Sequence, residues 1–396
     1  MPNAYSALGV SSSKTEVHAA TKNNDKGLFP FAFCKINPCK TFGPKYVKIS
    51  HADGAGTKSS LAYMYWKETG DMSVWHGIVQ DSIVMNLDDI LCVGGAAGEL
   101  DLTSNIDRNT FRIPGEVVAE LIKGENIFLN KMRGYGIDIT GQCGETADVP
   151  DLTQTLLVNN TMHCIMRRSA VIDNGNIREG DKIVGLASFG QAEYETEYNG
   201  GMRSNGLTLA RHGTLDKIYR KLYPETFEKK LGRKAYRGSA WLSDLVKVET
   251  GEKIPVGKLI LSPTRTYAPI IAKLHQTPGC VPVGMVHNSG GGMTKVLNYL
   301  SKPLKIVKDN LFDTPALFKM IQSNANVDWQ EMYQDFNMGC GMEIYVRSTR
   351  TAEKIIEISK SFGVDAKIIG HVSKARVPKP QVELITKHAG IFRYSR

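Results

Sequence analysis

The chain has 396 residues, of which 42% are apolar and 22% are charged. This usage is ordinary for globular proteins and excludes a mainly disordered chain, and at ~100–200 residues per domain the length predicts two or three domains. The formal net charge is only +9, and no uncharged apolar stretch approaches the ~18 residues of a membrane span, so we expect neither a nucleic-acid nor a membrane partner.

Cysteine usage and local charge add two further expectations. The seven cysteines include no Cys-x-x-Cys pair, and the first residues show no basic region followed by an apolar core. Both features favour reduced thiols in a cytoplasmic protein. Basic residues are densest between 217 and 237. We interpret this segment as a solvated face, with a surface for polyanions or phosphate as the alternative.

In chain order, the first predicted element is a strand at 46–51, where apolar and polar residues alternate. Helices are expected at 61–68, 74–92 and 113–133, and strands at 136–140, 156–158 and 162–166. The polar segment 173–176 interrupts this pattern, so we predict domains at 1–178 and 179–396. In the second domain we expect helices near 206–222, 264–276 and 313–323, and strands near 181–188, 281–287, 341–347 and 366–373.

The turn Asp53-Gly-Ala-Gly-Thr-Lys58 follows the first strand. Neither a Gly-x-x-x-x-Gly-Lys-[Ser/Thr] loop nor a Gly-x-Gly-x-x-Gly loop occurs in the sequence, so the two common phosphate-binding loops are absent. Glycines at 54 and 56 allow backbone amides to approach phosphate oxygens, and Lys58 can neutralise phosphate charge. A tight strand-to-helix turn without a ligand is an equally good local explanation.

Asp81, Asp88 and Asp89 lie in the predicted helix 74–92, among apolar residues. Asp81 and Asp88 are seven residues apart and therefore share a face. Adjacent carboxylates raise each other's pKa, so the pair at 88 and 89 favours a bound cation; a solvent-facing acidic stripe is the alternative. Glu145 and Asp148, in the loop after the strand at 136–140, add further carboxylates.

Three more polar or glycine-rich turns occur in the second half: Arg203-Ser-Asn-Gly206, His287-Asn-Ser-Gly-Gly-Gly292 and Phe336-Asn-Met-Gly-Cys-Gly341. A helix is expected to begin near Thr294. The glycines just before it therefore suggest an anion site at a helix N-terminus.

Taken in order, these residues resemble the phosphoribosylformylglycinamidine cyclo-ligases, also called aminoimidazole ribonucleotide synthetases. The resemblance runs over most of the chain. It includes Asp53 to Lys58, Asp81 to Asp89, Gly95-Ala96, Gly144-Glu-Thr-Ala147 with Pro150, Gly180-Asp181, Ser204-Asn-Gly206, Ser262-Pro-Thr-Arg-Thr-Tyr267, Gly290-Gly-Gly292 and Glu331 to Met342.

The resemblance implies an α+β chain of two domains, each a sheet with packed helices. It also implies a homodimer in which the N-terminal sheets of two chains close a β-barrel. The N-terminal domain would bind ATP and magnesium. The implied reaction is the ATP-dependent cyclisation of formylglycinamidine ribonucleotide to 5-aminoimidazole ribonucleotide, with release of ADP and phosphate. Two alternatives are a divergent paralogue that phosphorylates another small molecule and a non-catalytic nucleotide-binding protein.

The resemblance also assigns residues to roles. Magnesium would be held by Asp53, Asp89 and Glu145, with Asp88 and Asp81 as supporting carboxylates. The catalytic side chains would be Lys58, Arg203 and His287. The residues expected to bind nucleotide or substrate are Asp53, Gly54, Gly56, Thr57, Lys58, Asp88, Glu145 and Asn205.

The chain departs from the family pattern on the substrate side. Arg203 stands where the family has a histidine before Ser-Asn-Gly, and the stretches 191–202 and 213–261 are longer than expected. An arginine cannot act as a general base, but it can bind a phosphate in a bidentate way. We therefore expect Arg203 to supply positive charge, held by Glu193, Glu195 or Glu197 when the site is empty. A surface arginine without a role is the alternative.

Overall fold

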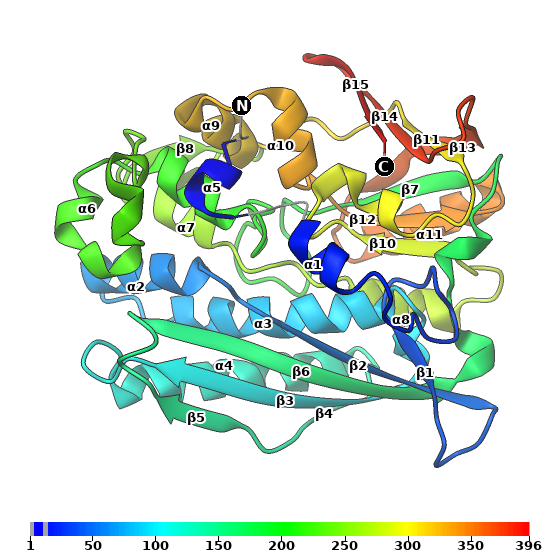
Figure 1. Cartoon of the computed structure of the whole chain (residues 1–396), viewed down its shortest axis with the longest axis horizontal. Helices are drawn as coiled ribbons and strands as arrows, with labels where there is room; N and C mark the ends of the chain where they lie inside the picture. Colours follow the sequence, from blue (N-terminus) through cyan, green and yellow to red (C-terminus); the bar gives the residue numbers. More distant parts are fainter. Residues whose placement is uncertain (1–3, 11–14, 396) are drawn as a thin grey trace.

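The computed structural model describes residues 4–10 and 15–395, in which two β-sheets are separated and flanked by helices (Figure 1). The first sheet has six strands in the order β1-β2-β6-β3-β4, with β5 also paired to β3. Their bounds are β1 (Ile36–Pro38), β2 (Tyr46–Gly54), β3 (Glu99–Arg108), β4 (Ile139–Gly141), β5 (Glu145–Asp148) and β6 (Leu156–Arg167).

The second sheet has seven strands in the order β10-β12-β7-β13-β11-β14-β15. All of them come from the second half of the chain. Their bounds are β7 (Lys182–Ala187), β10 (Gly284–His287), β11 (Leu304–Lys308), β12 (Cys340–Val346), β13 (Ala366–Lys374), β14 (Gln381–Thr386) and β15 (Gly390–Ser395). A separate hairpin joins β8 (Leu245–Lys247) to β9 (Lys253–Pro255). The mixed α+β class expected from the sequence is confirmed.

Helices pack on both sheets. Their bounds are α1 (Thr15–Ala20), α2 (Lys58–Thr69), α3 (Val74–Leu91), α4 (Gly115–Gly134), α5 (Leu207–Thr214), α6 (Tyr219–Leu222), α7 (Val256–Leu261), α8 (Ala268–Gln276), α9 (Ala316–Ala325), α10 (Trp329–Asp335) and α11 (Thr349–Ser361). No described helix is long and apolar enough to cross a membrane.

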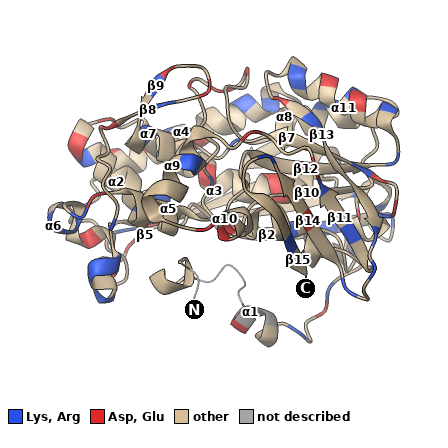
Figure 2. Ribbon diagram, turned by 90° about the horizontal axis from the view of Figure 1, so that it is seen from above, with Lys and Arg blue, Asp and Glu red and all other residues tan. Residues whose placement is uncertain are grey.

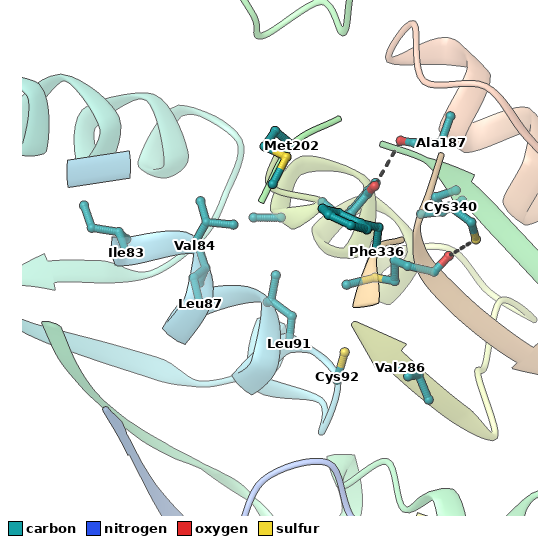
Figure 3. Packing of buried hydrophobic residues seen from close by; sticks show 14 of the residues in the cluster. Ile83, Val84, Leu87, Leu91, Cys92, Ala187, Met202, Val286, Phe336 and Cys340 are labelled. Atoms are coloured by element: carbon teal, nitrogen blue, oxygen red, sulfur yellow. Dashed lines mark hydrogen bonds between the residues drawn. The ribbon is translucent and has the colours of Figure 1, made fainter. Parts of the chain in front are cut away.

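Helix α3 is the centre of the molecule. It packs on β2 and β6 of the first sheet, lies beside α4, and also contacts α8 and β10 from the second half. Its side chains are buried on nearly every face, as expected for a helix that is apolar all round. Figure 3 shows Ile83, Val84, Leu87 and Leu91 of α3 in the buried cluster that also contains Phe336. One helix therefore carries core residues and the three aspartates into the space between the sheets.

The first sheet has one buried face and one exposed polar face. Along β6 burial alternates strictly, with Val158 and Met162 turned inward and Asn159 and His163 exposed. Such alternation is typical of an antiparallel sheet with one solvated face. The exposed face belongs to the strands that would pair in the expected β-barrel.

Most elements appear where the sequence predicts them, with three kinds of difference. The two strands expected at 156–158 and 162–166 are a single strand, β6, because polar Asn160 is accommodated by a hydrogen bond to Ser104. The helix expected at 206–222 ends at Thr214 and resumes only as the short α6. The helix expected at 264–276 begins only at Ala268, because backbone and hydroxyl groups of residues 264–267 bind the aspartates of α3.

The helices and strands without a prediction are β1, β3, β5, β8, β9, β11, β14, β15, α1, α7, α10 and α11. All seven cysteines are free, and all but Cys143 are buried, which agrees with reduced thiols.

Candidate active site

A pocket of about 510 Å³ opens at one end of the first sheet, where β2, β3, β5 and β6 meet. Asp53 and Glu145 both line it, and so do Asn105, Asn159 and Asn160. Carboxylate and amide oxygens are the ligands that Mg²⁺ prefers, usually as one or two carboxylates together with substrate phosphates. Two of the three predicted magnesium ligands are therefore in one pocket with suitable neighbours.

Backbone geometry explains why a glycine follows Asp53. A Cβ at Gly54 would lie 2.7 Å from the Val158 backbone carbonyl oxygen and 2.1 Å from Asn159 Oδ1, so no larger residue fits between β2 and β6 at this point. The Gly54 N–H is held by Asp53 Oδ1 at 2.8 Å. The turn then continues through Gly56, whose φ of +61° is in the left-handed region, to Thr57. Thr57 contacts Thr208 of α5 by a hydroxyl hydrogen bond of 3.1 Å, which ties this turn to the second half of the chain.

Lys58 does not face this pocket. Its ammonium group is fully buried, 2.9 Å from Asp81 Oδ1 and 2.5 Å from the Ser262 carbonyl oxygen. Burial lowers the pKa of Lys58, although the Asp81 carboxylate opposes that shift. The same Asp81 oxygen accepts from the Thr264 N–H at 2.7 Å. In this arrangement Lys58 joins α2 and α3 to the segment before α8. Lys58 was expected to contact phosphate, but the structure shows it in a buried ion pair with Asp81 instead.

The aspartates of α3 are not a solvent-facing stripe, since Asp81, Asp88 and Asp89 are all buried. Asp88 accepts from the Thr266 hydroxyl at 2.6 Å and from the Tyr267 N–H at 3.0 Å. Burial raises the pKa of Asp88 to about 7, against the opposing effect of these hydrogen bonds and of the Arg203 charge. Asp88 therefore joins α3 to the second half of the chain.

Asp89 belongs to a buried chain of charged and polar groups. Its Oδ1 lies 2.6 Å from His287 Nδ1, and its Oδ2 lies 3.4 Å from His51 Nε2. Burial alone would raise the pKa of Asp89, but the hydrogen bond and charge of His287, with smaller effects from His51 and Lys295, hold it below its usual value. An ionised Asp89 is thus stabilised by histidines.

On the other side of His287 lies Arg203, which donates to His287 Nε2 and, at 3.1 Å, to the Gly341 carbonyl oxygen. Burial, followed by the charge of Arg203, lowers the pKa of His287 to about 4. The imidazole is therefore neutral near pH 7, with Nδ1–H donating to Asp89 and Nε2 accepting from Arg203.

The expected cluster of three carboxylates is not formed. Asp89 faces the two histidines, whereas Asp53 and Glu145 line the pocket. Residues 4–10 and 15–395 contain no group of three His, Cys, Asp or Glu side chains arranged to hold a metal ion. The pair Asp53 and Glu145 is what this arrangement offers a magnesium ion that also binds substrate phosphates.

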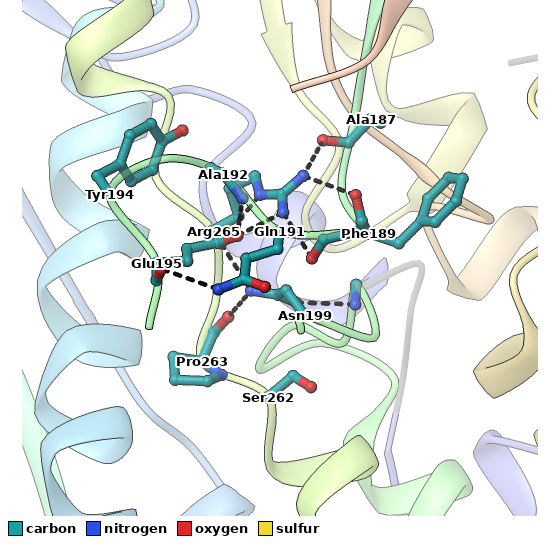
Figure 4. Close-up of polar contacts among 12 residues, drawn as sticks. Ala187, Phe189, Gln191, Ala192, Tyr194, Glu195, Asn199, Ser262, Pro263 and Arg265 are labelled. Carbon is teal, nitrogen blue, oxygen red and sulfur yellow. Dashed lines mark hydrogen bonds and ion pairs between the residues drawn. The ribbon is translucent and has the colours of Figure 1, made fainter. Parts of the chain in front are cut away.

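Arg203 is 3% exposed, which excludes a surface arginine. The glutamates of the 191–202 stretch do not hold it, so that expectation is wrong. Figure 4 shows Glu195 paired instead with Arg265, whose guanidinium also donates to the carbonyl oxygens of Ala187 and Phe189. Glu197 pairs with Lys258 at 3.0 Å. Arg265, within Ser262–Tyr267, therefore anchors the 191–202 stretch.

Asn205 is half-buried and lies against the glycine-rich turn, since a Cβ at Gly290 would be 2.9 Å from Asn205 Nδ2. The N-terminal segment reaches the same place, where the Tyr5 hydroxyl accepts from the Gly206 N–H at 3.3 Å. The helix expected after the glycines is the short 3-10 helix η7 (Gly292–Asn298), so the anion site proposed at an α-helix N-terminus is not supported.

Sequence reasoning missed several polar residues of this region. His51 bonds to Asn86 Oδ1 at 2.9 Å, and the Asn86 amide donates to the backbone carbonyl oxygens of Asp53 and Asn160. His51 stands two residues before Asp53 at the end of a predicted strand, which was a usable signal. The sequence offered no comparable signal for Asn159 and Asn160, because these residues lie between two segments that were interpreted as separate strands.

The basic segment at 217–237 includes α6 and lies at the edge of the molecule, where Figure 2 shows several Lys and Arg residues. Its exposed members are Lys217, Lys221, Lys229, Lys230, Arg233, Lys234 and Arg237. Arg220 turns inward and donates to the carbonyl oxygens of Ala235 and Tyr236. This placement agrees with a solvated face.

Comparison with curated proteins decides the family. The chain is 30% identical over 336 residues to the phosphoribosylformylglycinamidine cyclo-ligase of Methanococcus vannielii, which covers 84% of this chain and 79% of that protein. The chain belongs to the phosphoribosylformylglycinamidine cyclo-ligase family. The enzymes of the same name from Methanocaldococcus jannaschii and Desulfotalea psychrophila are 28% and 29% identical, each over 84% of this chain and 79% of the relative. A search of protein-family models finds no match.

Solved structures share the fold of this cyclo-ligase family member at low identity. Thermotoga maritima PurL complexed with ADP aligns with a TM-score of 0.52 at 13% identity, over 98% of this chain and 49% of PurL. The chain thus spans about half the length of PurL. A chain of the HypE–HypF complex aligns with a TM-score of 0.54 at 14% identity, over 97% of this chain and 99% of that chain.

Proposed function

We propose that this protein is an ATP-dependent cyclo-ligase that converts formylglycinamidine ribonucleotide to 5-aminoimidazole ribonucleotide, with release of ADP and phosphate. The observation that carries the proposal is the meeting of Asp53 and Glu145 in one pocket. These residues come from two separate motifs of the family resemblance. Among solved structures of this fold, PurL is complexed with ADP in one case and with FGAR in another.

The reaction needs an activated amide. The formyl amide oxygen attacks the γ-phosphorus of ATP, the bond from phosphorus to the ADP oxygen breaks, and the amide nitrogen loses its proton to give an iminophosphate. The nitrogen that will close the ring then attacks the activated carbon. The carbon–oxygen bond breaks, phosphate leaves, and a proton is lost from the attacking nitrogen. The protein contributes mainly positioning and neutralisation of charge, as in other phosphoryl transfers.

We assign the magnesium ion to Asp53 and Glu145, with the remaining positions left to phosphate oxygens and water. Magnesium supplies neutralisation of the charge that develops on the phosphates. The backbone of Gly54, Gly56 and Thr57 would contact the phosphates, since this turn is adjacent to Asp53 and has no side chain larger than threonine.

We assign Asn205, Arg203 and His287 to the substrate side. Arg203 is the permanently charged group of this set and is held against neutral His287. Asp89 then fixes the imidazole from the other side, so it acts through His287. A change at Asp89 should therefore alter the orientation of His287 and, through it, of Arg203.

We further propose a homodimer and two domains, 1–178 and 179–396. The open edge of the first sheet at β1 supports the dimer, because two such sheets paired edge to edge would close a β-barrel and remove free strand edges. The division into two domains is supported by the strands, since all strands of the first sheet end by Arg167 and all strands of the second sheet begin at or after Lys182.

The test is an assay of purified protein with ATP, magnesium and a panel of candidate substrates. ADP release that depends on formylglycinamidine ribonucleotide supports the cyclo-ligase. Accumulation of a stable phosphorylated product from another small molecule would indicate a kinase instead. ATP binding without any substrate-dependent ADP release would indicate the non-catalytic alternative.

A further inference from the structure

A fully buried ion pair lies beneath the glycine-rich turn and takes no part in the site described above. Lys308 and Glu343 are both 0% exposed, and Lys308 Nζ lies 2.5 Å from Glu343 Oε1. Lys308 ends β11 and Glu343 is in β12, and β7 and β13 separate these strands in the sheet. The two side chains therefore meet across the sheet rather than on adjacent strands.

The pair is bonded to both ends of the turn. At the start of the turn, the Asn288 amide donates to Glu343 Oε1 at 2.8 Å. At its end, Lys308 Nζ donates to the Met293 carbonyl oxygen at 2.6 Å. Glu343 Oε2 is satisfied by the Tyr345 hydroxyl at 2.7 Å. Residues 289–292 between the two anchors contain three consecutive glycines, which have no side chains to fix their conformation.

The turn held in this way has little freedom on its outer side. A Cβ at Gly292 would lie 2.4 Å from the Phe336 carbonyl oxygen, and Gly290 lies against Asn205. Asn288 directly follows His287, the neighbour of Arg203 and Asp89. A shift of either anchor would therefore be transmitted to Asn205 and His287.

We propose that Lys308 and Glu343 are positioning residues that set the conformation of the glycine-rich turn, and through it the affinity of the site for the ribonucleotide substrate. The proposal deepens the cyclo-ligase function and rests on it for the identity of that substrate. A purely hydrophobic core at this place would pack as well, since replacing both members of a buried ion pair often leaves stability little changed. Unlike such a core, the pair binds the turn at two points.

Two charge-neutral double variants of the full chain test the proposal. Lys308→Met with Glu343→Gln keeps an acceptor oxygen for Asn288, while the new amide nitrogen can donate to the Tyr345 hydroxyl oxygen, so only the Met293 end is released. Lys308→Met with Glu343→Leu releases both ends. The matched control is Lys305→Met with Glu383→Gln, which removes a pair of 2.7 Å that also starts on β11 but does not contact the turn.

Hydrogen exchange of a peptide covering 288–294 and steady-state kinetics are the two readouts. We expect exchange in this peptide to be at least tenfold faster when both ends are released, and intermediate when one end is released. The KM for formylglycinamidine ribonucleotide should rise at least tenfold, with kcat within threefold and the KM for ATP unchanged. The control variant should match the unmodified protein in both readouts.

Unchanged exchange in both folded double variants overturns the proposal. An unchanged ribonucleotide KM despite faster exchange overturns it as well. If the Leu variant fails to fold, the milder Gln variant alone decides between these outcomes. An unmodified protein that shows no turnover of the ribonucleotide refutes the cyclo-ligase function instead, and the exchange measurement then decides whether the pair holds the turn.

Discussion

Removing the charge of Asp88 and removing the charge of its neighbour Asp89 should change the stability of the folded protein in opposite directions. Burial raises the pKa of Asp88 from 3.8 to about 7, whereas the hydrogen bond and charge of His287 outweigh burial at Asp89 and lower its pKa. Asparagine is an isostere of a protonated aspartate. In Asp88→Asn, the new amide can offer its oxygen to the Tyr267 N–H and its nitrogen to the Thr266 hydroxyl oxygen, so both existing contacts are kept.

The direction in which the stability changes with pH follows from the number of protons bound by the folded and unfolded chains. Between about pH 4 and pH 7 the folded protein holds a proton on Asp88 that the unfolded chain has lost, so stability falls as the pH rises through this window. Each pKa unit corresponds to ~1.36 kcal/mol, and the shift from 3.8 to about 7 therefore penalises the charged carboxylate by about 4 kcal/mol. Of this penalty, about 2 kcal/mol should develop between pH 5.5 and pH 8.

Urea unfolding followed by tryptophan fluorescence, with buried Trp75 as a reporter, gives the measurement. Relative to the unmodified protein, Asp88→Asn should gain about 2 kcal/mol more at pH 8 than at pH 5.5. Asp89→Asn is the matched control and should be destabilised at both values, because the lowered pKa of Asp89 supplies stability that is lost only below about pH 4. A stability difference for Asp88→Asn that does not change with pH would refute the reasoning.

Three further predictions concern the site and the assembly. Asp53→Asn and Glu145→Gln should each abolish turnover and weaken magnesium-dependent ATP binding in calorimetry, with unchanged melting temperature; near-normal turnover in both would remove the proposed metal role. Arg203→Ala should lower kcat/KM at least tenfold, equivalent to ~1.4 kcal/mol, and unchanged constants would place this side chain outside the site. Light scattering of the full chain should give twice the mass of one chain, and a monomer at micromolar concentration would contradict the proposed barrel.

The sequence was sufficient for the long helices. Helix α4 appears close to its predicted bounds because its apolar residues recur at helical spacing, whereas α3 is apolar all round and was recognisable by the length of its apolar run. Strand β3 was missed although Leu100, Leu102 and Ile106 alternate with polar residues. Its polar side faces the exposed side of the sheet, where charged residues obscure the pattern. Strands β14 and β15 form a hairpin, with β15 at the edge of the sheet, so their pairing with each other is local, and only the pairing of β14 with β11 joins segments far apart in the sequence.

For the site, the family motifs identified the polar residues but not their partners. The sequence predicts that Lys58 binds phosphate, yet the fold brings Asp81 and the Ser262 carbonyl oxygen into contact with its ammonium group. Arg203 was expected to pair with nearby glutamates, yet it meets His287, 84 residues further along the chain. Neither partnership has a local signal, because each joins segments that are separate in the sequence and meet only in the folded chain.

The central claim is the cyclo-ligase reaction, and product formation tests it most directly. Purified protein should be incubated with ATP, magnesium and formylglycinamidine ribonucleotide, with 5-aminoimidazole ribonucleotide and ADP quantified by mass spectrometry. We predict one ADP for each aminoimidazole formed, and no ADP above background when the ribonucleotide is omitted. ADP release without aminoimidazole, or no turnover at all by a folded protein that binds ATP, would contradict the proposed function.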